Sequence, residues 1–144
     1  MKQITTDQTD HPRTPFLYKK LGYQIVGAIF QVRNLYGSGQ KELVYQNALS
    51  EEFTELNIPF KREVSISIKS QKTHKTLGHY KLDFAVDEKI IIEVKAVKFT
   101  PAKMEQQLYT YLRSTPYQVG YLVNFASTNL YCHRVILTND RKKS

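Results

Sequence analysis

The segment Leu82–Lys95 constrains the fold most, because its two apolar runs each carry a charge. The runs predict two β-strands, and residues 87–89 between them predict a three-residue hairpin loop. Such a loop would pair Asp83 opposite Glu93, and the two-residue period of a strand would place Lys95 on the same face. The apolar residues of the two runs would point the other way, into the core: Leu82, Phe84, Ile92 and Val94. We therefore expect two carboxylates and an amine to converge on a sheet surface that remains available for chemistry.

The two facing carboxylates would need a positive partner. At a separation of about 5 Å they would repel each other by several kcal/mol at an effective dielectric constant of about 20. A divalent cation between them, or protonation of one of them, would remove this repulsion. In the alternative interpretation, Lys95 bridges Asp83 and Glu93 as a structural ion pair on a solvated sheet face. The residues alone leave both interpretations open.

Length and composition indicate one ordinary domain. A chain of 144 residues can bury a single core without a disulfide or a structural metal. Its formal net charge of +8 favours a polyanionic partner, for which nucleic acid is the obvious candidate, although excess lysine is also common on soluble surfaces. The single cysteine, Cys132, excludes an intramolecular disulfide and fits a reducing compartment. The chain has no signal-like start and no apolar run of about 20 residues, so we expect a soluble, cytoplasmic protein.

The order of the predicted elements gives the fold class. We expect a flexible N-terminal arm over residues 1–15, a single domain over 16–138 and a basic C-terminal tail over 139–144. Apolar residues at helical spacing predict three helices: 17–36, 40–56 and 98–114. The second helix should bury five residues: Leu43, Ala48, Leu49, Phe53 and Leu56. Strands are expected at 60–69, in the central hairpin, and at 117–125 and 130–137. The order α-α-β-β-β-α-β-β predicts an α/β fold whose mixed β-sheet is flanked by helices.

The positions of the acids in this order resemble those of the PD-(D/E)XK nuclease superfamily. The first core helix carries an acid, the second strand carries Asp83, and the third strand carries Glu93 and Lys95 in the pattern Glu-x-Lys. The block Gly39-Gln-Lys-Glu42-Leu-Val-Tyr45 also resembles the signature of the GxxExxY family within that superfamily. Similar blocks follow in the same order: Tyr80-Lys-Leu-Asp83, Ile92-Glu93-Val-Lys95-Ala96, Gln107-Leu-Tyr-Thr-Tyr111-Leu112 and Gly120-Tyr-Leu-Val-Asn124-Phe125. One position departs from the pattern, since Leu82 stands where a proline is usual.

The resemblance implies a restriction-endonuclease-like core and a role for each of the matching residues. By position, Asp83 and Glu93 would hold Mg²⁺ or Mn²⁺, and Glu42 would add a further metal or water contact. Lys95 would assist the attacking water, and Gln107 would position the site from the helix that crosses between strands. The implied activity is hydrolysis of phosphodiester bonds by a nuclease, with DNA as the expected substrate, although no motif distinguishes DNA from RNA.

A different class of function also fits the residues. The fold could serve as a catalytically silent module that binds nucleic acid or docks a partner protein. Small nucleases of this kind often act as dimers or within larger assemblies, which the sequence neither supports nor excludes. Asn124 and Arg134 could contact backbone phosphate, and Arg134 could equally pair with an acid. Tyr45 should pack, and Glu63 should be an ordinary surface charge.

Overall fold

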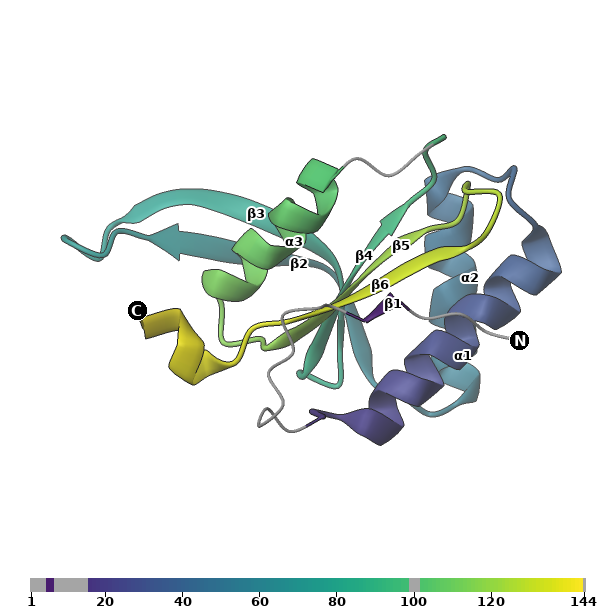
Figure 1. The fold of residues 1–144 in the computed structure, drawn as a ribbon, viewed down its shortest axis with the longest axis horizontal. Helices are drawn as coiled ribbons and strands as arrows, with labels where there is room; N and C mark the ends of the chain where they lie inside the picture. Colours follow the sequence, from purple (N-terminus) through teal and green to yellow (C-terminus); the bar gives the residue numbers. More distant parts are fainter. Residues whose placement is uncertain (1–4, 7–15, 99–101, 144) are drawn as a thin grey trace.

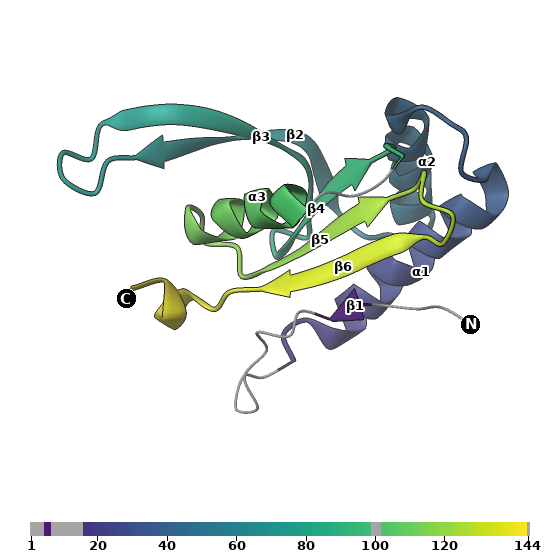
Figure 2. The same cartoon turned by 45° about the horizontal axis from the view of Figure 1, so that its top comes forward.

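The computed structural model describes residues 5–6, 16–98 and 102–143. Its centre is a six-stranded mixed sheet in the order β1-β6-β5-β4-β3-β2, with helices on both faces (Figures 1 and 2). The three α-helices are α1 (Lys19–Tyr36), α2 (Glu42–Glu55) and α3 (Ala102–Arg113). The strands are β1 (Thr5–Thr6), β2 (Phe60–Lys69), β3 (Thr76–Val86), β4 (Ile90–Lys95), β5 (Val119–Asn124) and β6 (Tyr131–Ile136). None of the helices in these ranges combines the length and the apolar character needed to cross a membrane.

The predicted fold class is confirmed. Strands β4 and β5 are parallel, and the chain passes between them through α3, as the predicted crossover requires. The other pairs are antiparallel, apart from the short β1, which runs parallel to β6. Residues 99–101, at the start of the helix predicted over 98–114, lie outside the described residues. At the other end, the expected basic tail forms a short 3-10 helix, η1 (Asn139–Lys143), in which Lys142 Nζ donates to the carbonyl oxygens of Thr115 and Tyr117.

The core is divided by the sheet into two clusters. One cluster lies against α1 and α2, and the other lies against α3. Strand β4 contributes to both, because Ile90 and Ile92 point to the first cluster and Ile91 points to the second. A strand that is buried on both faces has no apolar alternation, and this accounts for the continuous run of three isoleucines.

The β2–β3 hairpin changes faces at one point, which corrects the predicted alternation. Phe84 lies in the cluster against α1 and α2, whereas Leu82 lies in the cluster against α3, although the two-residue period predicts one face for both. The pairing of β2 with β3 skips Glu63 and Asp83, and Glu63 has a φ of 50°. Such an irregularity increases the local twist of a hairpin. Asp83 is therefore at the point where the hairpin changes faces. The part of the hairpin between this point and its tip projects past the rest of the sheet (Figures 1 and 2).

The buried face of α2 contains Ala48, Leu49 and Phe53, as predicted, but not Leu43 and Leu56, and Tyr45 packs as expected. Leu43 is 60% exposed and Leu56 is 44% exposed, while Tyr45 is fully buried. The Tyr45 ring stacks on Phe125 with 4.4 Å between ring centroids. Its hydroxyl donates to the carbonyl oxygen of Gly37 over 2.6 Å and accepts the N–H of Gln40 over 3.0 Å. These bonds hold the loop that leads into α2, which starts at the acid of the sequence block described above.

We predict that Gly120→Ala destabilises the protein by about 1–3 kcal/mol, because a Cβ at this site overpacks the core. A Cβ on Gly120 would lie 3.0 Å from Leu108 Cδ1 and 3.1 Å from Ile91 Cγ1, between β5 and α3. Gly39→Ala is the control, since a Cβ there meets nothing within 4 Å. The control should change the free energy of unfolding by no more than about 0.5 kcal/mol. Urea denaturation measures the free energy of unfolding of both variants. Equal stability of the two variants would contradict the close packing around Gly120.

Candidate active site

The centre of the candidate site is the pair Asp83 and Glu93 on β3 and β4. The three-residue turn and the pairing of Phe84 with Ile92 agree with the predicted register, which places Asp83 opposite Glu93 one step further on. The backbone pairing of β3 with β4 stops at Phe84 and Ile92, and beyond it hydrogen bonds from side chains join the two strands. The Val94 N–H donates to Asp83 Oδ2 over 2.7 Å, and the Asp83 N–H donates to Glu93 Oε1 over 3.1 Å. Each carboxylate is thus bound to the backbone of the opposite strand.

Glu93 is buried and Asp83 is partly buried, and this burial raises the pKa of both carboxyl groups. Glu93 is only 5% exposed, and burial together with the charge of Asp83 raises its pKa to about 8. Burial also raises the pKa of Asp83, even though the Val94 N–H and the charges of Lys95 and Arg62 lower it. Ionisation of both groups at neutral pH is therefore unfavourable unless a cation is present.

Glu42, the first residue of α2, interacts electrostatically with the pair. Burial raises the pKa of Glu42, Asp83 raises it further, and Lys95 lowers it. Its Oε1 accepts from Gln46 Nε2 over 3.3 Å, and Gln46 Oε1 accepts from Arg62 Nη2 over 3.0 Å. In the described part of the chain, however, no three carboxylate, histidine or cysteine side chains are close enough to form a preassembled metal centre. Glu42 is thus within electrostatic range of the pair, but the three acids do not meet at one point.

Lys95 follows Glu93 by two residues on β4 and pairs in register with Asn124 of β5. Its positive charge lowers the pKa of Glu42, Asp83 and Glu93, so the ammonium lies near all three acids. It forms no salt bridge with any of them, since the salt bridges between described residues are surface pairs. These pairs are Lys61–Glu88, Lys81–Glu63 and Lys89–Asp87. The structure therefore gives no support to Lys95 as a structural bridge.

Helix α3 covers the pair with a residue that sequence analysis missed. Tyr111 is buried, and burial together with the charge of Glu93 raises the pKa of its hydroxyl to about 12. Its ring packs on that of Tyr80, with 4.9 Å between centroids. Gln107 lies four residues earlier on α3 and is exposed. The four-residue spacing in the helix was the available signal for Tyr111, because it places both residues on adjoining parts of one face.

Two residues expected to contact phosphate are structural. Asn124 is fully buried, and its Oδ1 accepts the N–H groups of Val97 and Ala126 while its Nδ2 donates to the Val97 carbonyl. It therefore holds the chain that follows Lys95. Arg134 is 1% exposed, and its guanidinium lies 4.4 Å from the centroid of the Phe16 ring, so it packs within the protein.

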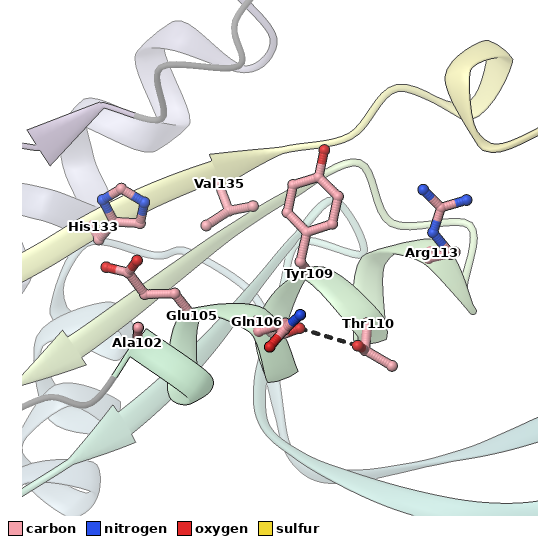
Figure 3. A pocket seen from close by; sticks show the side chains of 8 residues that line it. All are labelled: Ala102, Glu105, Gln106, Tyr109, Thr110, Arg113, His133 and Val135. Carbon is pink, nitrogen blue, oxygen red and sulfur yellow. Dashed lines mark hydrogen bonds between the residues drawn. The ribbon is translucent and has the colours of Figure 1, made fainter.

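A separate pocket of about 560 Å³ lies between α3 and β6 (Figure 3). It is lined by Ala102, Glu105, Gln106, Tyr109, Thr110, Arg113, His133 and Val135. Neither carboxylate of the central pair contributes to it, so this pocket is not part of the candidate site.

The donor atoms of the central pair fit a hard divalent cation. Carboxylate oxygens are the ligands that Mg²⁺ and Mn²⁺ prefer. Asp83 and Glu93 each use one oxygen for a backbone N–H, and no hydrogen bond between described residues uses the second oxygen of either. A cation would also remove the repulsion that raises the pKa of both groups.

Comparison with protein-family models identifies the family of the chain. The family model of the PD-(D/E)XK nuclease superfamily matches residues 19–135, a range that extends from α1 into β6 and includes every residue of the candidate site. A comparison with curated proteins finds no match. The chain therefore belongs to the PD-(D/E)XK nuclease superfamily, whose members are generally nucleases.

We predict that the stability of the metal-free protein depends on Glu93 between about pH 4.5 and about pH 8. The folded state raises this pKa from 4.5 to about 8, so in this range it binds a proton that the unfolded chain has lost. The resulting stabilisation is complete below the unfolded-state pKa of 4.5, and it is lost as the pH rises through the folded-state pKa of about 8. Glu93→Gln keeps the acceptor for the Asp83 N–H and removes the titration. Its Tm should therefore rise relative to the wild type as the pH increases in EDTA, and a constant difference would contradict the assignment.

Proposed function

We propose that this protein is a metal-dependent nuclease that hydrolyses phosphodiester bonds, with DNA as its substrate. The observation that carries the proposal is the pair of a partly buried Asp83 and a buried Glu93, bound across two strands, with Lys95 close by but in no salt bridge with either. A structural ion pair would bring the lysine into contact, and a solvated surface would not bury Glu93. Membership of a nuclease superfamily is consistent with the same interpretation.

In this proposal the residues of the chain have distinct roles. Asp83 and Glu93 hold Mg²⁺ or Mn²⁺, and Glu42 adds a contact to the metal or to its water. Such an ion, when bound, neutralises the carboxylates, lowers the pKa of a water and stabilises the charge that develops on the phosphate. Lys95 supplies a point charge beside the attacking water or the scissile phosphate.

Neighbouring residues keep these groups in place. Asn124 fixes the backbone just after Lys95 through its bonds to Val97. Tyr111 excludes water from Glu93, which strengthens electrostatic interactions in the site. Gln107 is proposed to orient bound water or phosphate from α3, where its side chain is exposed.

We also infer that the chain belongs to the GxxExxY family. The block contains Gly39, Glu42 and Tyr45, and two of these have roles in the structure that need their chemistry. Glu42 lies within electrostatic range of Asp83, and the Tyr45 hydroxyl bonds both Gly37 and Gln40 at the loop before α2. A cytoplasmic location fits the one cysteine, Cys132, whose burial raises the pKa of its thiol to about 12 and keeps it unreactive.

A silent nucleic-acid-binding module is the second candidate function. The observation in its favour is that the described residues contain no preassembled group of three metal-binding side chains. Protonation of Glu93, whose pKa is raised to about 8, would reduce the negative charge that the site presents to nucleic acid. Measurement of cleavage separates the two functions.

We predict that Asp83→Asn and Lys95→Met each lower the rate of DNA cleavage in Mg²⁺ or Mn²⁺ by at least about 100-fold. Both variants should still bind DNA, because each changes one charge in the site and no packed apolar side chain. Asp87→Asn, in the turn between β3 and β4, and Lys61→Met, on β2, are controls at residues of surface salt bridges, and both should cleave at the wild-type rate. Wild-type protein that binds DNA but cleaves neither DNA nor RNA in either metal would favour the silent module.

A further inference from the structure

The distal part of the β2–β3 hairpin, residues 64–82, forms an arm that extends beyond the other strands (Figures 1 and 2). The sequence between Glu63 and Asp83 contains no acidic residue. It contains four lysines and two histidines, all of them exposed: Lys69, Lys72, His74, Lys75, His79 and Lys81. The arm thus carries positive charge without a compensating acid within it.

One face of the arm is fixed to the body of the protein. Val64, Ile66 and Leu82 pack in the cluster that also contains Leu108 and Leu112 of α3. This contact holds the arm beside α3, where both views show it (Figures 1 and 2). The position of the arm relative to Asp83 is therefore set by packing.

The opposite face of the arm is polar and open to solvent. It carries Ser65 paired with Lys81 and Ser67 paired with His79, and Ser67 Oγ lies 3.2 Å from His79 Nδ1. Every side chain in these two pairs can donate a hydrogen bond to an anion.

The tip of the arm is held in one conformation by its own hydrogen bonds. Ser70 Oγ accepts the N–H groups of Lys72 and Thr73, each over 3.1 Å, and the Ser70 N–H donates to the Lys75 carbonyl over 2.8 Å. At the base of the tip, Lys69 Nζ donates to Thr76 Oγ1 over 2.7 Å. Lys72 and Lys75 are exposed, and no salt bridge between described residues involves either, so their ammonium groups are available to a ligand.

We propose that this arm binds the phosphodiester backbone of the nucleic acid and delivers it to the Asp83–Glu93 pair, an inference that rests on the proposed function. Strand β3 runs from the tip to Asp83 without interruption. From Thr76 to Asp83 it covers about 23 Å at about 3.3 Å per residue, which equals the length of about seven base pairs. The arm therefore spans several phosphates on one side of the scissile bond.

The test compares two triple variants that each lower the formal net charge of +8 by three. The arm variant is Lys69→Gln, Lys72→Gln and Lys75→Gln. The control variant is Lys19→Gln, Lys20→Gln and Lys61→Gln, which changes exposed lysines at the start of α1 and of β2. The start of α1 lies far from the tip of the arm in both views (Figures 1 and 2).

Binding is measured by fluorescence anisotropy in EDTA over a series of salt concentrations, with duplex DNA, single-stranded DNA and RNA as probes. Each lost phosphate contact lowers the slope of log K against log salt by about 0.7–0.9. The arm variant should lose about 2–3 units of slope, and the control variant less than about 1. The probe with the largest loss identifies the substrate class. Equal losses in both variants, or no loss in the arm variant, would overturn the proposal.

Failure of this inference can be distinguished from failure of the proposed nuclease activity, because the binding assay needs no metal and no turnover. Asp83→Asn should keep the wild-type salt slope. If the protein cleaves, the arm variant should keep kcat and raise KM. If the arm variant loses binding but the wild-type protein cleaves no substrate, the proposed role of the arm in binding is supported and the proposed nuclease activity is rejected. If the protein binds polyglutamate through the arm as tightly as it binds nucleic acid, the proposal is overturned in favour of an acidic protein partner.

Discussion

The structure depends on the exchange of hydrogen bonds between two carboxylates and two backbones. At the point where β3 and β4 stop pairing, Asp83 accepts the N–H of Val94, and Glu93 accepts the N–H of Asp83. These bonds join strands whose ladder has ended, so the carboxylates are positioned by the sheet itself. The hairpin of β2 and β3 changes faces at the same place, where pairing skips Glu63 and Asp83. One interruption of the sheet thus creates the candidate site and redirects the arm.

The buried carboxylates are a cost that the surroundings only partly offset. Desolvation raises the pKa of Glu93, Asp83 and Glu42, while the charge of Lys95 lowers all three without direct pairing. Arg62 acts on Asp83 and also bonds Gln46, which bonds Glu42, so one network connects β2, α2 and the pair. Such an arrangement favours binding of a cation over an empty site, because the cation supplies the charge that the protein lacks there.

The register of the central hairpin and the crossover through α3 could be predicted, since each depends on local chain length and side-chain period. The buried face of the second helix could be predicted only in part, because Ala48, Leu49 and Phe53 are buried as expected while Leu43 and Leu56 are exposed. Its start at Glu42 rotates Tyr45 inward and Leu43 outward, and this depends on the contact of Tyr45 with Phe125, far away in sequence.

Other features of the candidate site depend equally on tertiary contacts. Leu82 and Phe84 lie in different core clusters because the pairing of β2 with β3 is interrupted at Glu63. No glycine or proline in the sequence marks this interruption. Burial likewise makes Asn124 and Arg134 structural, whereas their residue types alone suggest surface contacts.

The most direct test of the central claim is a titration of Mg²⁺, Mn²⁺ and Ca²⁺ into the metal-free protein, with Tm as the measurement. If Asp83 and Glu93 form a cation site, each ion should raise the Tm, with a stabilisation of about 2.7 kcal/mol at about 100 times its Kd. The rise should be lost in Asp83→Asn and kept in the turn control Asp87→Asn. A rise that persists in Asp83→Asn, or none at millimolar metal in the wild type, would contradict the claim.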